Sequence, residues 1–408
     1  MNTASITLNQ SGRFSVNWIV NKKSDLLFFI GGALTGYAMF FLHSGLHLDM
    51  VTVWFLWVVL IDTPHFFGTY VRTYFDKEEF KARKPLLIGS LFWLLVGPVF
   101  IVLSYILYQL DIKVYTVPFY FYVLFFNLWA YWHVVRQHYG IMSLYKKKNQ
   151  DFDLPDTRID KYLLYGGLLA PFAAFIIRHP EARMVLGLQG SFPAYPSTSS
   201  GIFSFEFLSQ LHWEHVVVFV SVLFMIAISI LFIYRQIQRW QMGMPLNIPK
   251  ILFFIALIPL YSYINYSSAV MTAPLIAFSA FVTVYHDIQY HTIVWFYYKN
   301  RYHKPGVEKK KYGLAVKISR NFATYMLSGI AMAAFLRFLG CGFEIHPGCG
   351  AIVMSSKTLL FGTLSTKELL YSIIIGIPLH HYFVDQYIWR PSKDKVLRED
   401  LKLEKKAN

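Results

Sequence analysis

Long apolar runs separated by short polar segments dominate this sequence. A helix rises about 1.5 Å per residue, so roughly 20 apolar residues cross the hydrocarbon core of a bilayer. The first run lacks the small-residue cleavage site of a signal peptide, and we interpret it as a retained span. We predict an all-α polytopic membrane protein with about ten spans, at residues 26–42, 51–70, 86–110, 114–145, 162–177, 213–234, 251–264, 269–298, 318–339 and 369–389.

Lysine and arginine residues gather at every second boundary between these runs, near residues 22–23, 77–84, 146–148, 235–239, 299–311 and 390–398. The intervening connections are poor in positive charge, and the basic loops of a membrane protein are normally the cytoplasmic ones. We therefore predict that both termini are cytoplasmic. The chain is interpreted as one integral domain, with an N-terminal segment at 1–24, a helical bundle at 25–390 and a charged tail at 391–408.

The composition agrees with a membrane protein. Of the 408 residues, 55% are hydrophobic and 15% are charged, whereas charged residues make up about a quarter of a soluble domain. The formal net charge is +15, but the basic residues lie in short clusters between apolar runs, so we expect no nucleic-acid partner. We expect an integral protein of the bacterial inner membrane or of the endoplasmic reticulum.

The two cysteines, Cys341 and Cys349, are too few for a disulfide scaffold or a cysteine metal site. Both fall in the last predicted outer loop. An oxidising compartment would permit a disulfide between them, and two separate thiols are the other interpretation.

Seven histidines lie inside four of the predicted spans. An ionisable residue there costs several kcal/mol unless it is paired or lines a cavity, which marks it as a functional candidate. In each of the four spans the last of these histidines precedes a basic boundary residue by seven to nine positions. The set therefore lies at one depth, roughly 10 to 14 Å from the cytoplasmic boundary. The predicted metal ligands are His65, His133, His138, His286, His291, His380 and His381.

Three carboxylates also lie inside the spans, each three or four residues from one of these histidines. Asp62 precedes His65 by three residues, Asp287 precedes His291 by four, and Asp385 follows His381 by four. Residues three or four apart share a helix face, so each acid can orient or supplement a histidine ligand. We predict that Asp62, Asp287 and Asp385 are further ligands or support the ligands, together with Gln137 and Gln289.

Imidazole and carboxylate groups suit iron, zinc, copper or manganese. The segments HVVRQH (133–138) and HDIQYH (286–291) each place two histidines five residues apart. Such residues point about 140° away from one another on a regular helix, so two metal centres explain the pattern more economically than one.

The two H-x4-H segments and the adjacent His380 and His381 resemble the histidine boxes of membrane di-iron desaturases, hydroxylases and related lipid oxygenases. The sequence departs from that pattern, because it has no complete H-x2-HH segment and more spans than the usual desaturase. The resemblance implies two irons that activate O2 for attack on a lipid or isoprenoid substrate, with electrons from a cytoplasmic donor. In design alone the chain also resembles the bacterial Brp/Blh carotene-cleaving proteins.

Other functions remain open from the residues. A zinc-dependent lipid hydrolase also uses histidines with an acid, although seven histidines exceed what one zinc needs. Histidine and aspartate side chains line proton or metal transporters, and paired histidines can bind haem. The outer halves of the histidine-bearing spans are almost purely apolar, for example 51–61 and 369–379. A pocket open to one side favours catalysis on a hydrophobic, lipid-like substrate, and beyond that substrate we expect contacts with membrane lipids.

Overall fold

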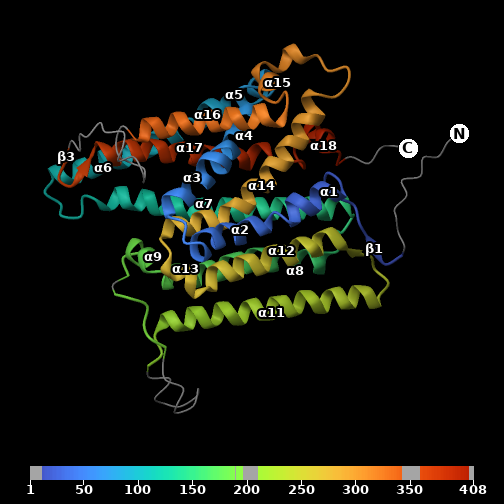
Figure 1. Ribbon diagram of the computed structural model, residues 1–408, viewed down its shortest axis with the longest axis horizontal. Coiled ribbons are helices and arrows are strands. Elements are labelled where there is room, and N and C mark those ends of the chain that lie inside the picture. Colours follow the sequence, from blue (N-terminus) through green and yellow to red (C-terminus); the bar gives the residue numbers. More distant parts are fainter. Residues whose placement is uncertain (1–11, 189, 196–209, 342–358, 404–408) are drawn as a thin grey trace. The chain divides into compact units, whose positions relative to one another are not determined.

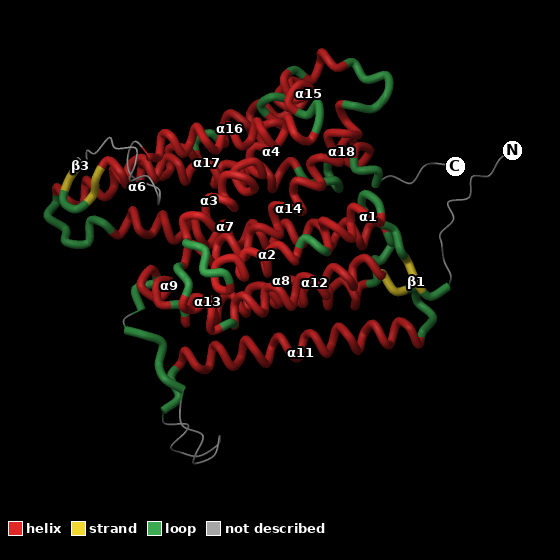
Figure 2. The backbone as a smooth tube through the Cα atoms, viewed as in Figure 1, coloured by secondary structure: helices red, strands yellow, loops and turns green. Residues whose placement is uncertain are grey.

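The computed structural model describes residues 12–188, 190–195, 210–341 and 359–403. Figure 2 shows that helices make up most of this chain. The strands are short: β1 (Phe14–Ser15) pairs in parallel with β2 (Leu246–Asn247), and β3 (Leu359–Phe361) pairs antiparallel with β4 (Leu364–Ser365). The predicted all-α class is confirmed for the described residues. Cys349 lies outside them, so its pairing stays a prediction.

Five helical segments are long and apolar enough to cross a membrane, which indicates a multi-pass membrane protein. Each overlaps one of the ten predicted spans. The other five spans and the orientation of the chain stay predictions. The five segments are Lys22–Gly45, Lys77–Gln109, Leu154–Arg178, Trp213–Gln241 and Ile248–Tyr266.

Large apolar side chains cover the outer faces of these segments. Phe219 and Ile230 are 63% and 60% exposed, and Val99 is 62% exposed. A soluble protein rarely exposes apolar surface on this scale, because removing apolar surface from water is favourable by about 25 cal/mol per Å². These faces suit contact with lipid.

The chain forms two compact units. Unit 1 contains residues 1–48, 135–286 and 405–408, and unit 2 contains residues 49–134 and 287–404. Two long helices, α7 (Val117–Lys148) and α14 (Leu275–Tyr302), contribute residues to both units (Figure 1).

Unit 1 is built on α8, which packs against α11 and α12. Asp153 caps the N-terminus of α8 by accepting a hydrogen bond from the backbone N–H of Asp156, and a proline follows in the first turn. The helices of unit 1, besides its parts of α7 and α14, are α1 (Lys22–Ser24), the π-helical η1 (Asp25–Ile30), α2 (Ala33–Phe40), the π-helical η2 (Phe41–Gly45), α8 (Leu154–Arg178), α9 (Pro180–Val185), α11 (Trp213–Gln241), α12 (Ile248–Tyr266) and α13 (Ser268–Thr272).

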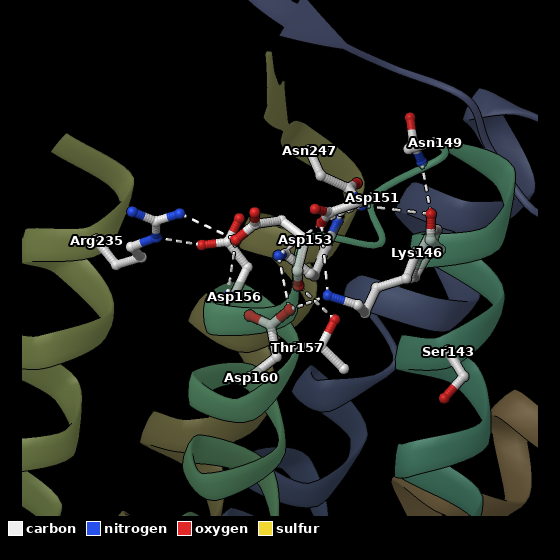
Figure 3. A network of polar contacts seen from close by, with 12 residues as sticks. Ser143, Lys146, Asn149, Asp151, Asp153, Asp156, Thr157, Asp160, Arg235 and Asn247 are labelled. Atoms are coloured by element: carbon white, nitrogen blue, oxygen red, sulfur yellow. Dashed lines mark hydrogen bonds and ion pairs between the residues drawn. The ribbon is translucent and has the colours of Figure 1, made fainter. Parts of the chain in front are cut away.

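Unit 1 also contains a largely buried group of acids and bases around the connection between α7 and α8, shown in Figure 3. Lys250 Nζ lies 2.7 Å from a carboxylate oxygen of Asp151 and 2.8 Å from one of Asp160. Every member has an oppositely charged partner, and the four acids balance the four bases. We call this group the charge cluster; its members are Asp151, Asp153, Asp156, Asp160, Lys146, Arg235, Arg239 and Lys250.

The charge cluster determines the protonation of Asp151, which lies in the connection outside the spanning segments. Burial by itself raises the pKa of this carboxyl group. The ammonium groups of Lys250 and Lys146 and the guanidinium of Arg239 outweigh burial, so the pKa of Asp151 lies well below its ordinary value. Asp151 therefore stays charged and holds the bases together.

Unit 2 is built on two helix pairs, α6 with α17 and α4 with α16. The crossing of α6 and α17 is close: a Cβ at Gly376 would lie 2.7 Å from the Trp93 carbonyl oxygen, so only glycine fits. The helices of unit 2, besides its parts of α7 and α14, are α3 (Met50–Trp57), the π-helical η3 (Val58–Asp62), α4 (Thr63–Thr73), α5 (Lys77–Ser90), α6 (Trp93–Gln109), the 3-10 helix η4 (Lys309–Tyr312), α15 (Leu314–Ile318), α16 (Phe322–Cys341), α17 (Thr366–Ile388) and α18 (Lys395–Asp400).

Candidate metal centre

Three of the predicted ligands meet inside unit 2. His65 on α4, His133 on α7 and His381 on α17 are all buried, and one ring nitrogen of each lies within 4.8 Å of those of the other two. The ring centroid of His381 is 4.6 Å from that of His65 and 4.9 Å from that of His133. We call these residues the histidine triad. Three helices far apart in the sequence thus bring three imidazoles to one point.

A hydrogen-bond network determines which ring nitrogen of His381 carries the hydrogen. Thr69 Oγ1 donates to Asp385 Oδ1 at 2.6 Å, and it also lies 2.7 Å from His381 Nδ1. The one hydroxyl hydrogen of Thr69 is used on Asp385, so His381 Nδ1 must carry a hydrogen and donate it to Thr69. His381 Nε2 then has a bare lone pair. This atom is buried and has no hydrogen-bond partner within the described part of the chain.

A carboxylate supports the second member of the triad. Asp287 Oδ1 lies 3.1 Å from His65 Nδ1, and Asp287 Oδ2 accepts a hydrogen bond of 3.1 Å from Trp57 Nε1. Both side chains of the pair are fully buried or nearly so. A carboxylate behind an imidazole fixes the orientation of the ring and raises its basicity, which is the usual arrangement behind a histidine ligand.

Aromatic rings enclose the triad. The ring of Tyr382 stacks on His133 at 4.5 Å, and Tyr290 meets His65 edge to face at 4.4 Å. Tyr290 also lies 2.6 Å from Thr69 Oγ1 through its hydroxyl group. These rings keep the imidazoles in place and exclude water from their surroundings.

His291 lies beside the triad, with its ring centroid 6.4 Å from that of His65. Its Nδ1 is 3.0 Å from the hydroxyl of Tyr325, and its Nε2 is 3.0 Å from the carbonyl oxygen of Ile61. Both ring nitrogens are thus engaged. A role for His291 as a ligand would require one of these bonds to break.

His380 contacts different residues from its neighbour His381. Its Nε2 lies 2.8 Å from the Tyr74 hydroxyl and 3.1 Å from Ser90 Oγ, and its ring stacks on that of Tyr70. Successive residues of a helix point about 100° apart, so the two histidines face different neighbours. The contacts of His380 are therefore those of a polar residue in helix packing.

The other two histidines of the H-x4-H segments, His138 and His286, lie in unit 1. The rings of His138 and His286 are 6.4 Å apart, and His138 Nε2 lies 2.8 Å from the hydroxyl of Tyr261. Gln137 Nε2 donates a hydrogen bond of 2.6 Å to the backbone oxygen of His286. In unit 2, Gln289 is fully buried and Asp62 is half-buried.

Three residues that support the triad did not emerge from the sequence pattern. Thr69 lies four residues after His65 on the same face of α4, so helical spacing could have identified it. Tyr290 lies three residues after Asp287 and could have been found in the same way. Trp57 lies on α3, and only the folded chain shows its bond to Asp287.

Comparison of the chain with models of protein families, with curated proteins and with solved structures finds no significant match. The resemblance to histidine-box enzymes therefore rests on the histidine pattern. The structure adds a buried histidine cluster among apolar helices that can hold a metal ion.

Proposed function

We propose that this protein is a membrane-embedded, metal-dependent oxidoreductase that acts on an apolar, lipid-like substrate. The observation that carries the proposal is the histidine triad, in which His65, His133 and His381 present ring nitrogens within 4.8 Å of one another. Five apolar helices long enough to span a membrane support the location.

The residues of the triad fit a metal ion. His381 Nε2 is a buried acceptor without a hydrogen-bond partner in the described chain, and leaving such an atom unsatisfied costs about 1 to 3 kcal/mol. A cation at this point removes that cost. Imidazole nitrogens combined with a nearby carboxylate form a donor set that iron accepts.

Iron bound here would supply the redox chemistry needed to activate O2 toward an inert C–H bond or an alkene. The protein's own contribution is to hold and shield the ligands. Asp287 orients His65, and the chain from Asp385 through Thr69 orients His381. Tyr290 and Tyr382 keep water from the rings. We also propose a second iron and a cytoplasmic electron donor.

A zinc-dependent lipid hydrolase is the second candidate, and one observation favours it. Three histidines with an open fourth position are a common ligand set of catalytic zinc, and the triad has this number. Zinc at this point would lower the pKa of a bound water and so provide a nucleophile for ester or amide hydrolysis.

Elemental analysis of the full chain purified in detergent separates these candidates. We expect iron bound in stoichiometric amount and an optical spectrum without a Soret band. Stoichiometric zinc without iron would replace the oxidoreductase by the hydrolase, and a Soret band would indicate haem instead. Protein that binds none of these after incubation with each would contradict a metal centre.

A further inference from the structure

Tyr290 on α14 contacts both the histidine triad and a tryptophan of unit 2. Its ring meets that of His65 edge to face at 4.4 Å and lies 5.7 Å from that of His381. The ring of Trp389 is 5.9 Å away, and Trp389 Nε1 donates a hydrogen bond of 3.3 Å to the Tyr290 hydroxyl oxygen. Tyr290 is 2% exposed. A phenol ring is thus buried against two of the three proposed metal ligands.

The bonds of Thr69 determine where the hydroxyl group of Tyr290 donates its hydrogen. The one hydroxyl hydrogen of Thr69 goes to Asp385 Oδ1, so in the 2.6 Å contact with Thr69 Oγ1 the donor is Tyr290. The hydroxyl of Tyr290 also lies 3.3 Å from Asp385 Oδ1. Both acceptors of the Tyr290 hydrogen therefore lead to one carboxylate, either directly or through Thr69.

This arrangement suits the removal of one electron from Tyr290. An oxidised phenol that keeps its proton carries a positive charge, which is costly in an apolar interior. Asp385 offers a place for that proton. As the Tyr290 hydrogen moves to Thr69 Oγ1, the Thr69 hydrogen moves to Asp385 Oδ1. The products are a neutral tyrosyl radical and a neutral carboxylic acid, so no charge is left unpaired.

Two neighbouring rings lack such an arrangement. Tyr382 stacks on His133 at 4.5 Å, but its hydroxyl has no hydrogen-bonded acceptor in the part of the chain that the structure describes. Trp389 has the guanidinium carbon of Arg72 4.0 Å from its ring centroid, and this positive charge opposes the formation of a tryptophan radical cation. Of these three rings, Tyr290 is the one with a proton acceptor and without a cation on its face.

We propose that Tyr290 is a redox-active tyrosine that gives one electron to oxidised iron at the histidine triad. The proposal rests on the proposed function and assigns a redox role to a residue of the chain itself. In this step Tyr290 loses one electron and its hydroxyl hydrogen, the iron gains the electron, and Asp385 gains a proton through Thr69. The cytoplasmic one-electron donor then returns the electron, and Asp385 returns the proton.

The test uses the full chain in detergent, loaded with Fe²⁺, mixed with hydrogen peroxide as the oxidant and frozen for electron paramagnetic resonance. We expect a tyrosyl radical signal that is absent from iron-free protein and narrows when the chain carries ring-deuterated tyrosine. Tyr290→Phe keeps the ring against His65, so it should bind as much iron as the wild type and lose the signal. Iron-loaded wild-type protein without the signal would overturn the proposal.

Two further variants and a change of solvent sharpen the test. Tyr382→Phe is the matched control, because this ring lies equally close to the triad, and it should keep the signal. In Asp385→Asn the amide accepts a hydrogen bond but takes up no proton, so the signal per bound iron should be lost. In the wild type the radical should form more slowly in D2O than in H2O, because the hydroxyl hydrogen moves with the electron.

Each of these results has an opposite that contradicts the role of Tyr290. A signal that survives in Tyr290→Phe or in Asp385→Asn would do so, as would its loss in Tyr382→Phe or equal rates in the two solvents. The metal centre stands in all of these cases if iron is bound. Stoichiometric zinc without iron would overturn the oxidoreductase, and the redox role of Tyr290 with it, because zinc accepts no electron.

Discussion

The histidine triad of unit 2 and the charge cluster of unit 1 are both largely buried polar groups among apolar helices, and they differ in the charges that they bring together. In the charge cluster four acids meet four bases, and each has an oppositely charged partner. In the triad three imidazoles meet, and His381 Nε2 has no hydrogen-bond partner in the described chain.

This difference separates a structural group from a candidate metal site. A balanced cluster stabilises the ends of the helices that carry it and offers nothing to a ligand. A set of convergent nitrogen donors gains from a cation that the protein itself does not supply. A buried polar atom without a hydrogen-bond partner therefore does not by itself indicate function, since Asp160 Oδ1 and Arg239 Nε of the charge cluster are also such atoms in the described chain. The convergence of three nitrogen donors distinguishes the triad.

The largest expected effect is the loss of metal on removing a triad member. His133→Ala should bring bound metal below detection, because two imidazoles cannot replace a three-ligand set. Elemental analysis of purified protein measures this. The matched control is His47→Asn, an exposed histidine with a φ of 54° that asparagine tolerates. Full metal content in His133→Ala would exclude the triad as the site.

Substitution of a residue in the charge cluster should lower the stability of the protein. Lys250→Met removes one partner of two buried carboxylates, Asp151 and Asp160, and should lower the free energy of unfolding by about 3 to 5 kcal/mol. Thermal unfolding in detergent measures this, and bound metal should not change among folded molecules. Lys395→Met, at a side chain 73% exposed, should leave the stability almost unchanged. A stability of Lys250→Met equal to that of the control would refute the structural role.

A residue that supports the triad should have a smaller effect on metal. Thr69→Val keeps the shape of the side chain and removes its bonds to His381 and Asp385. Metal affinity should fall about 10- to 100-fold, the usual cost of losing such a partner. Thr69→Ser keeps the hydroxyl group and should bind as the wild type does. Equal affinities in the valine and serine variants would show that Thr69 does not orient His381.

The smallest effect concerns pH and the charge cluster. The pKa of Asp151 is lower in the folded than in the unfolded protein, so its contribution to stability is present above about pH 4, its ordinary pKa, and is lost as the pH falls further. Asp151→Asn should be less stable than the wild type at pH 7, and the gap should narrow below about pH 4. Unfolding temperatures across this range measure it, and a constant gap would contradict the assignment.

The sequence by itself determined the class of the protein. Apolar runs of membrane length predict helices because a helix satisfies its backbone hydrogen bonds within a single segment, and five such segments appear in the structure. Histidines and carboxylates are rare in such runs, so those that do occur there indicated a candidate cluster.

Only the tertiary structure decided which of these residues meet. The sequence placed seven histidines at one predicted depth but did not show which of them meet. In the structure His65, His133 and His381 converge, while His291 bonds to Tyr325 and Ile61. Spacing along a helix determines which residues share a face. It does not determine which faces of different helices pack together, because that depends on side-chain contacts between segments far apart in the sequence, such as the approach of α17 to α4 that sets Thr69 beside His381.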